Sequence, residues 1–263
     1  MSGQRSPGPV GGNAQVEEID AGTSARISTP APALAQTTAQ SQSSSPGSST
    51  ADVPMSGGVL YAIGQASVVR IPVPGTNGLC IELNPKGWVP SGGSTSTLFF
   101  QDATGKRQLR LDYGYNVKTR TIDYHWNQKG TFAEFGIADH TPAGQAGEVA
   151  YKAAKYFRYG GRVLLVVGIA VDIVSIVQAS KPMRRASQVV AGWAAAWAGC
   201  EVVGAGGAAL GTLASPLGTA IGGVGGCIIG GIGGYYGGSI VGGDVYDWAE
   251  NTFFTPLPEV AGP

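Results

Sequence analysis

Two histidines, His125 and His140, are the first residues in this chain to test for chemistry, because it contains no others. Each has a carboxylate close by in the sequence, Asp123 and Asp139. Such pairs can act as a general acid or base, or bind a metal ion. The chain has neither the HExxH motif of zinc proteases nor a GxSxG serine nucleophile with partners. We therefore expect no catalytic residue, metal or cofactor. An enzymatic toxin that uses His125 and His140 remains a distant alternative hypothesis.

The three cysteines, Cys80, Cys200 and Cys227, fit no metal-binding spacing. An odd number also cannot be fully paired in disulfides. Cys200 and Cys227 lie in apolar sequence. Buried free cysteine behaves as a small hydrophobic side chain, and this is the role that we expect for both.

A glycine repeat is the most regular pattern in the chain. Seven glycines recur at every fourth residue, with isoleucine and valine between them and no charged residue. In water each glycine costs a helix about 1 kcal/mol relative to alanine. In a bilayer the helix is favoured because it satisfies its own backbone hydrogen bonds, and small residues let a second helix approach closely. The predicted helix-packing groove consists of Gly218, Gly222, Gly226, Gly230, Gly234, Gly238 and Gly242.

The length of this stretch also fits a membrane helix. A helix over residues 217–243 would extend for roughly 40 Å, against a hydrocarbon core of about 30 Å. The turn over residues 212–217 joins it to a second apolar stretch, 189–213. No charged residue lies between Glu201 and Asp244, so the tip of this hairpin can cross a bilayer without a charge. The alternative is a buried glycine-rich core in a soluble protein.

Charged residues around the apolar stretches give two further expectations. Asp172 and Glu201 interrupt apolar sequence, and intramembrane carboxylates usually face a bundle interior or an aqueous path. They are the pore-lining candidates, unless each pairs locally with Arg or Lys. Basic residues near the apolar stretches are expected at the membrane surface. The alternative is that the predicted helix 145–159, which carries several of them, is an ordinary surface helix packed on the β domain. The basic residues are Lys152, Lys155, Arg158, Arg162, Lys181, Arg184 and Arg185.

The sequence predicts an α+β protein in three parts. Residues 1–55 are rich in Ser, Pro and Gly and are expected to be a disordered tail without a secretory signal peptide. Residues 56–142 alternate in the manner of strands and predict a small antiparallel β domain. Residues 143–263 predict a helical membrane-inserting domain. The net charge of zero argues against a nucleic-acid partner.

The expected elements follow from local patterns. Strands are predicted at 58–64, 67–73 and 79–83, with prolines at edges or turns. A hairpin joins 98–101 to 106–113, and 119–126 is expected to pair with 131–135. Helices are predicted at 145–159, 163–177 and 189–213. The last helix begins at Ser215-Pro216, a good N-cap followed by a good first residue, and ends near Gly243.

Roughly half of the chain resembles the pore-forming or membrane-disrupting effectors of type VI secretion and related bacterial polymorphic toxin systems. The resemblance rests on the segments 124–130, 135–137, 140–142 and 154–159, and on the glycine repeat. It implies export without a signal peptide and insertion into the inner membrane of a target cell. It also implies self-association in the membrane, a cognate immunity protein and a secretion adaptor or carrier. The alternative is a non-toxic envelope protein that the hairpin anchors and that displays the β domain.

Overall fold

The structure is a computed structural model that describes residues 55–84 and 95–254. These residues lie within one compact unit, Ser48–Pro263. They form a six-stranded antiparallel sheet followed by long helices, which confirms the α+β class with a helical C-terminal half. Residues 1–54 of the predicted tail, together with Pro85 and Pro90, lie outside the described residues.

The sheet is a simple meander in which each strand pairs with the next in the chain. Its strands are β1(Ile71–Pro72), β2(Cys80–Glu82), β3(Leu98–Gln101), β4(Gln108–Asn116), β5(Thr121–Lys129) and β6(Thr141–Pro142). The predicted hairpin between β3 and β4 is present. Pro72 lies in β1, an edge strand, where its missing N–H breaks no central ladder.

Two strand predictions are wrong, and the strand predicted at 67–73 is confined to Ile71–Pro72. Residues 58–64 belong to a helix, α1(Met55–Gln65), because tertiary packing overrides the strand-like composition. A Cβ at Gly64 would lie 2.3 Å from the backbone nitrogen of Leu165, so this segment is selected for close helix packing. Residues 131–135 do not pair with 119–126. They form α2(Phe132–Phe135), and β5 continues to Lys129 and pairs with β4 along its whole length.

Three long helices follow: α3(Gly144–Gln178), α4(Pro182–Thr212) and α5(Pro216–Phe253). α3 is one helix where the sequence suggested two. Ser215 caps α5 as predicted, accepting a hydrogen bond from the backbone N–H of Gly218 at 3.0 Å. α5 continues ten residues beyond the predicted end at Gly243. Ion pairs between the last turns of α5 and the start of α4 hold this extension.

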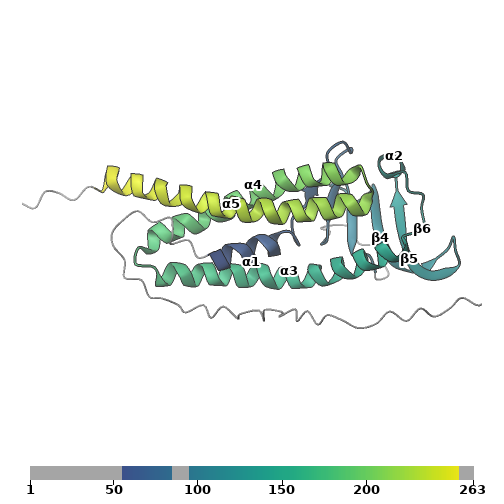
Figure 1. Ribbon diagram of the computed structural model, residues 1–263, viewed down its shortest axis with the longest axis horizontal. Coiled ribbons are helices and arrows are strands. Elements are labelled where there is room, and N and C mark those ends of the chain that lie inside the picture. Colours follow the sequence, from purple (N-terminus) through teal and green to yellow (C-terminus); the bar gives the residue numbers. More distant parts are fainter. Residues whose placement is uncertain (1–54, 85–94, 255–263) are drawn as a thin grey trace, which may run out of the picture. The chain divides into compact units, whose positions relative to one another are not determined.

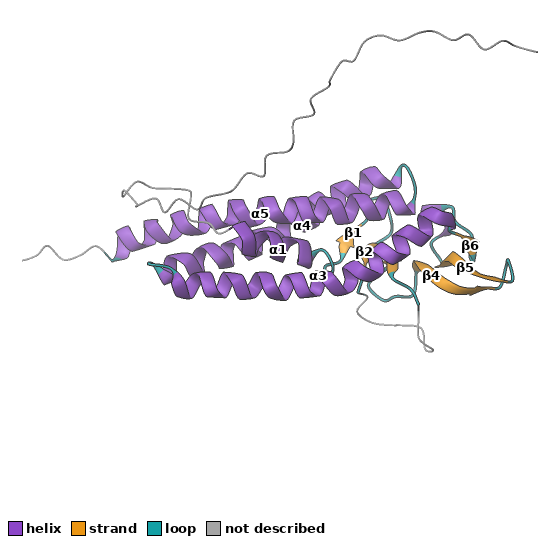
Figure 2. Cartoon of the chain, turned by 60° about the horizontal axis from the view of Figure 1, so that its bottom comes forward, coloured by secondary structure: helices purple, strands orange, loops and turns teal. Residues whose placement is uncertain are grey.

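α1 packs on α3 and also contacts α5 and α4 (Figures 1 and 2). Glycines seven residues apart line the contact between α1 and α3 from both sides: Gly57 and Gly64 on α1, Gly161 and Gly168 on α3. The sheet contributes Ile71 and other apolar side chains to a core that also contains Cys200, Ala208, Ala220 and Cys227 of the α4–α5 hairpin. The sheet thus covers one face of the half of the hairpin nearest its turn.

Candidate functional site

The α4–α5 hairpin is closely packed at every glycine of the repeat. A Cβ built on any of the seven glycines would lie 2.2–2.7 Å from a backbone carbonyl oxygen of α4, a distance that no real Cβ tolerates. The facing residues of α4 also recur every fourth position. From the turn outward they are Gly211, Gly207, Val203, Gly199, Ala195, Ala191 and Ser187.

The chain's own helix α4 therefore fills the groove. At its centre, Gly230 approaches Gly199 so closely that a Cβ on either would lie 2.1–2.2 Å from the carbonyl oxygen of the other. Each glycine serves as a contact point for the opposite backbone, as in close-packed membrane helix pairs. A second set of glycines on α5, Gly225, Gly233 and Gly237, has open space at the Cβ position.

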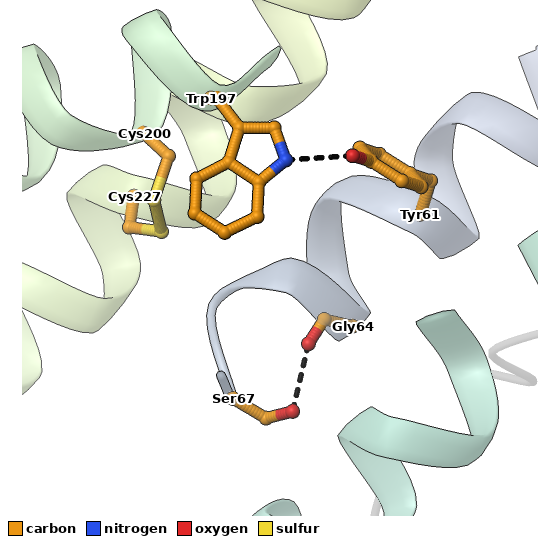
Figure 3. The surroundings of a disulfide bond; sticks show 6 residues. All are labelled: Tyr61, Gly64, Ser67, Trp197, Cys200 and Cys227. Atoms are coloured by element: carbon orange, nitrogen blue, oxygen red, sulfur yellow. Dashed lines mark hydrogen bonds between the residues drawn. A yellow bond between two sulfur atoms is a disulfide. The ribbon is translucent and has the colours of Figure 1, made fainter. Parts of the chain in front are cut away.

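A disulfide joins the two helices within this contact. Cys200 and Cys227 are both fully buried and bonded to each other, with 3.7 Å between their Cα atoms. The prediction that they pack as free thiols is wrong, because the antiparallel hairpin brings two apolar segments into register. Figure 3 shows Trp197 beside this bond, with its indole N–H donating to the Tyr61 hydroxyl at 2.7 Å. The bond therefore lies where α1 meets the hairpin.

The outward faces of the long helices are apolar. All three are long and apolar enough to cross a membrane, and only 17% of the most apolar stretch of α3 is buried. The exposed side chains include Val163, Val166, Ile173, Val177, Val202, Leu210, Ile221, Ile229 and Val241. Contiguous apolar surface of this kind marks a site of contact with a membrane or another protein. It is compatible with membrane association.

Asp172 lies at the centre of a buried polar network. Its carboxylate accepts hydrogen bonds from the Trp193 indole at 2.9 Å and the Tyr235 hydroxyl at 2.8 Å. The guanidinium of Arg185 lies 3.8 Å away, and both charged side chains are buried. Arg185 also donates to the Ser175 hydroxyl. In this arrangement Asp172 connects α3 with α4 and α5.

Glu201, the other predicted pore-lining residue, is exposed on α4. The basic residues predicted to lie at a membrane surface are mostly engaged elsewhere. Lys152 pairs with Glu148, Lys181 with Glu250 and Arg184 with Asp247. Arg158 and Arg162 both donate to the side-chain oxygen of Asn84. Lys155 is exposed.

The structure also brings the two histidines together. The rings of His125 on β5 and His140 before β6 are 5.5 Å apart between centroids. His125 is 3% exposed, and its Nδ1 lies 3.0 Å from the Asp123 carboxylate. Asn127 links the same ring to Asp112. The sequence did not predict this cluster, because strand pairing aligns residues that the sequence separates.

Electrostatics within this cluster favour an ionised Asp123. Burial alone raises the pKa of its carboxyl, but hydrogen bonds from Asn116, Thr119 and His125 outweigh burial and lower that pKa below its ordinary value. Within the described residues, no group of three or more His, Cys, Asp and Glu side chains could hold a metal ion. Burial raises the pKa of the Cys80 thiol, which weakens it as a nucleophile.

Three features were not predicted from the sequence: the contact between α1 and α3, the disulfide and the histidine cluster. A signal for the first was present in the spacing of seven between Gly57 and Gly64, and between Gly161 and Gly168. Comparisons with protein families, with curated proteins and with solved structures give no match for this chain.

Proposed function

We propose that this protein is an interbacterial toxin that inserts its α4–α5 hairpin into the membrane of a target cell and permeabilises it. The observation that carries the proposal is the apolar outward surface of α3, α4 and α5. Burying that surface in hydrocarbon gains roughly 25 cal/mol for each Å² removed from water. The helices satisfy their own backbone groups, which any structure in hydrocarbon must do.

The internal packing supports insertion as a preformed pair. In hydrocarbon, helices gain little from burying apolar surface against each other, so close backbone packing becomes a main attraction. The glycine contacts between α4 and α5 supply that packing. Glu201 is then the exposed carboxylate that we place beside an aqueous path, whereas Asp172 acts in holding the helices together.

The test compares glycines on the two faces of α5. Gly230→Leu places a large side chain against the backbone of α4, whereas Gly233→Leu makes the same chemical change where the Cβ position is open. Ile229→Leu, at an exposed position, is a second control. We expect Gly230→Leu to abolish dye leakage from liposomes and depolarisation of cells when the protein is exported to the periplasm. We expect both control variants to cause the same leakage and depolarisation as the parent protein.

The outcomes separate the possible functions. If Gly230→Leu causes as much dye leakage from liposomes as the parent protein, close packing of the hairpin is not needed for the activity. The proposal then loses its main structural support. If the parent binds liposomes without leakage or toxicity, the hairpin is a membrane anchor and the protein is the non-toxic envelope protein considered above.

One observation favours a second candidate function, an enzymatic toxin. His125, His140 and Asp123 form a cluster in which one histidine is oriented by a carboxylate, an arrangement suited to proton transfer. A membrane-inserting hairpin would then serve delivery and not permeabilisation. Substitution of the two histidines by alanine tests this candidate.

A further inference from the structure

The β4–β5 ribbon has an apolar face that extends beyond the core. Cross-strand pairs on one face run from Leu111 and Trp126, through Tyr113 and Tyr124, to Tyr115 and Ile122. The first pair is buried, and Tyr113 is 42% exposed. At the far end Tyr115 is 61% and Ile122 69% exposed. The same face that forms the core is therefore uncovered near the turn of the ribbon.

α3 covers this face only in part. The ring of Tyr151 on α3 lies 5.3 Å from that of Tyr124 and 6.2 Å from that of Tyr113. Beyond these two tyrosines, the ribbon continues to an exposed turn that carries Val117, Lys118 and Arg120. The ribbon thus ends in aromatic and aliphatic side chains next to two cations.

The uncovered face adjoins the start of α3. Tyr151 of this helix contacts both Tyr113 and Tyr124 of the ribbon, so the first turns of α3 join the ribbon to the apolar surface farther along the helix. Along α3, exposed Tyr156 and Tyr159 are followed by Val163 and Val166. Tyrosine and basic side chains next to an apolar span are typical of the membrane–water interface.

The charges around this surface are mostly positive. Lys118, Arg120 and Lys155 are exposed cations. Of the nearby carboxylates, Glu148 pairs with Lys152. Asp123 lies on the other face of the ribbon, since it pairs across the strands with Gly114, and it accepts hydrogen bonds from Asn116 and Thr119.

We infer that the turn end of the β4–β5 ribbon is a docking surface for anionic phospholipid headgroups, and that it rests on the membrane while the α3 surface faces the lipid. The inference rests on the proposed membrane function and names its lipid class. Tyr115 and Ile122 insert among the headgroups, and Lys118 and Arg120 attract their phosphates. Each basic residue near an anionic bilayer contributes about 1 kcal/mol, and this attraction falls with salt.

The experiment uses the full-length chain and sedimentation with phosphatidylcholine vesicles that contain or lack phosphatidylglycerol. The variant Lys118→Glu/Arg120→Glu reverses two charges at the ribbon turn. Its matched control, Lys106→Glu/Lys129→Glu, makes the same charge change among exposed lysines at the opposite end of the ribbon. Tyr115→Ser/Ile122→Ser removes the apolar part. Circular dichroism verifies the fold of each variant.

We expect the ribbon-turn variants to bind phosphatidylglycerol vesicles about tenfold more weakly or worse, and the control variant to bind as the parent does. The charge effect should disappear at high salt, and the parent should prefer the anionic vesicles. Equal loss in both charge variants would mean that overall charge, and not the ribbon turn, governs binding, and so overturns the inference. Parental binding by every variant also overturns it while leaving the hairpin proposal intact. If the parent protein neither binds vesicles of any composition nor makes them leak, the proposed function itself is overturned.

Discussion

At the scale of single residues, the histidine cluster shows how a sheet assembles polar groups. His125 pairs across the strands with Asp112 and with Pro142, the residue after Thr141 in the short β6. These positions lie on the face of the ribbon opposite Leu111 and Trp126, away from the main core. His140 has a positive φ of 55°, a backbone conformation that is uncommon outside glycine but that histidine adopts more often than most residues.

Alanine substitutions at the histidines distinguish an enzymatic function from a membrane-permeabilising one. We expect His125→Ala and His140→Ala to retain leakage from liposomes, because neither side chain belongs to the hairpin. His125→Ala should lower stability by roughly 1–3 kcal/mol, since it removes a buried ring together with its hydrogen bonds to Asp123 and Asn127. Leakage and urea unfolding measure the two effects. If a variant loses toxicity in cells while its liposome leakage and the amount of folded protein stay unchanged, the enzymatic hypothesis is favoured.

At the scale of elements, α4 and α5 behave as one unit. Their glycine contacts run over nearly the whole shared length, and the disulfide fixes their register near the middle. A separation of 27 residues between the cysteines places this bond in the range where a disulfide contributes a few kcal/mol. Disulfides persist in oxidising compartments, so the oxidised hairpin fits a protein that acts outside the cytoplasm.

The contribution of the disulfide can be measured directly. We expect Cys200→Ala/Cys227→Ala to lower the free energy of unfolding by about 3 kcal/mol, and dithiothreitol to destabilise the parent by a similar amount. The double variant itself should not respond to the reductant, which is the internal control. Equal urea midpoints for parent and variant, with and without reductant, would show that the two thiols are not bonded in the folded protein.

At the scale of the whole described unit, the sheet covers part of the hairpin that the proposed function inserts into the membrane. The half of the hairpin nearest its turn packs against Ile71, Ile81 and other apolar side chains of the sheet. A Cβ at Gly223 would lie 2.4 Å from Ile81, so the contact is close. A lipid-exposed open sheet does not lie within hydrocarbon. Complete insertion of the hairpin tip therefore requires the tip to leave the sheet.

Weakening this contact should speed permeabilisation. Ile81→Ala removes apolar surface that faces the hairpin and should cost roughly 2–5 kcal/mol of stability. Phe99→Ala is the comparison, because Phe99 is also buried but pairs across the strands with Glu82 and Arg110 on the opposite face. We expect faster leakage from liposomes for Ile81→Ala than for Phe99→Ala. Equal acceleration would indicate general unfolding, and no acceleration would mean that release from the sheet is not limiting.

The sequence by itself determined the elements whose signals are local and periodic. The alternation around Leu109 and Leu111 specified the β3–β4 hairpin, and Ser215-Pro216 specified the start of α5, since a cap and a first-turn proline act within one helical turn. The spacing of four between glycines predicted a close-packing face because it depends on helix geometry alone. The apolar composition of the C-terminal half likewise predicted helices able to span a membrane.

Only the tertiary structure decided features that depend on which segments meet. Residues 58–64 have the composition of a strand, yet they form α1 because Gly64 packs against the backbone of α3. The pairing of Cys200 with Cys227 depends on the register of two helices, and the approach of His125 to His140 depends on a two-residue strand. The overhang of Tyr115 and Ile122 depends on how far α3 extends over the ribbon. These are long-range contacts: the glycine spacing of seven marks faces suited to close packing, but no local pattern in the sequence specifies which segments meet.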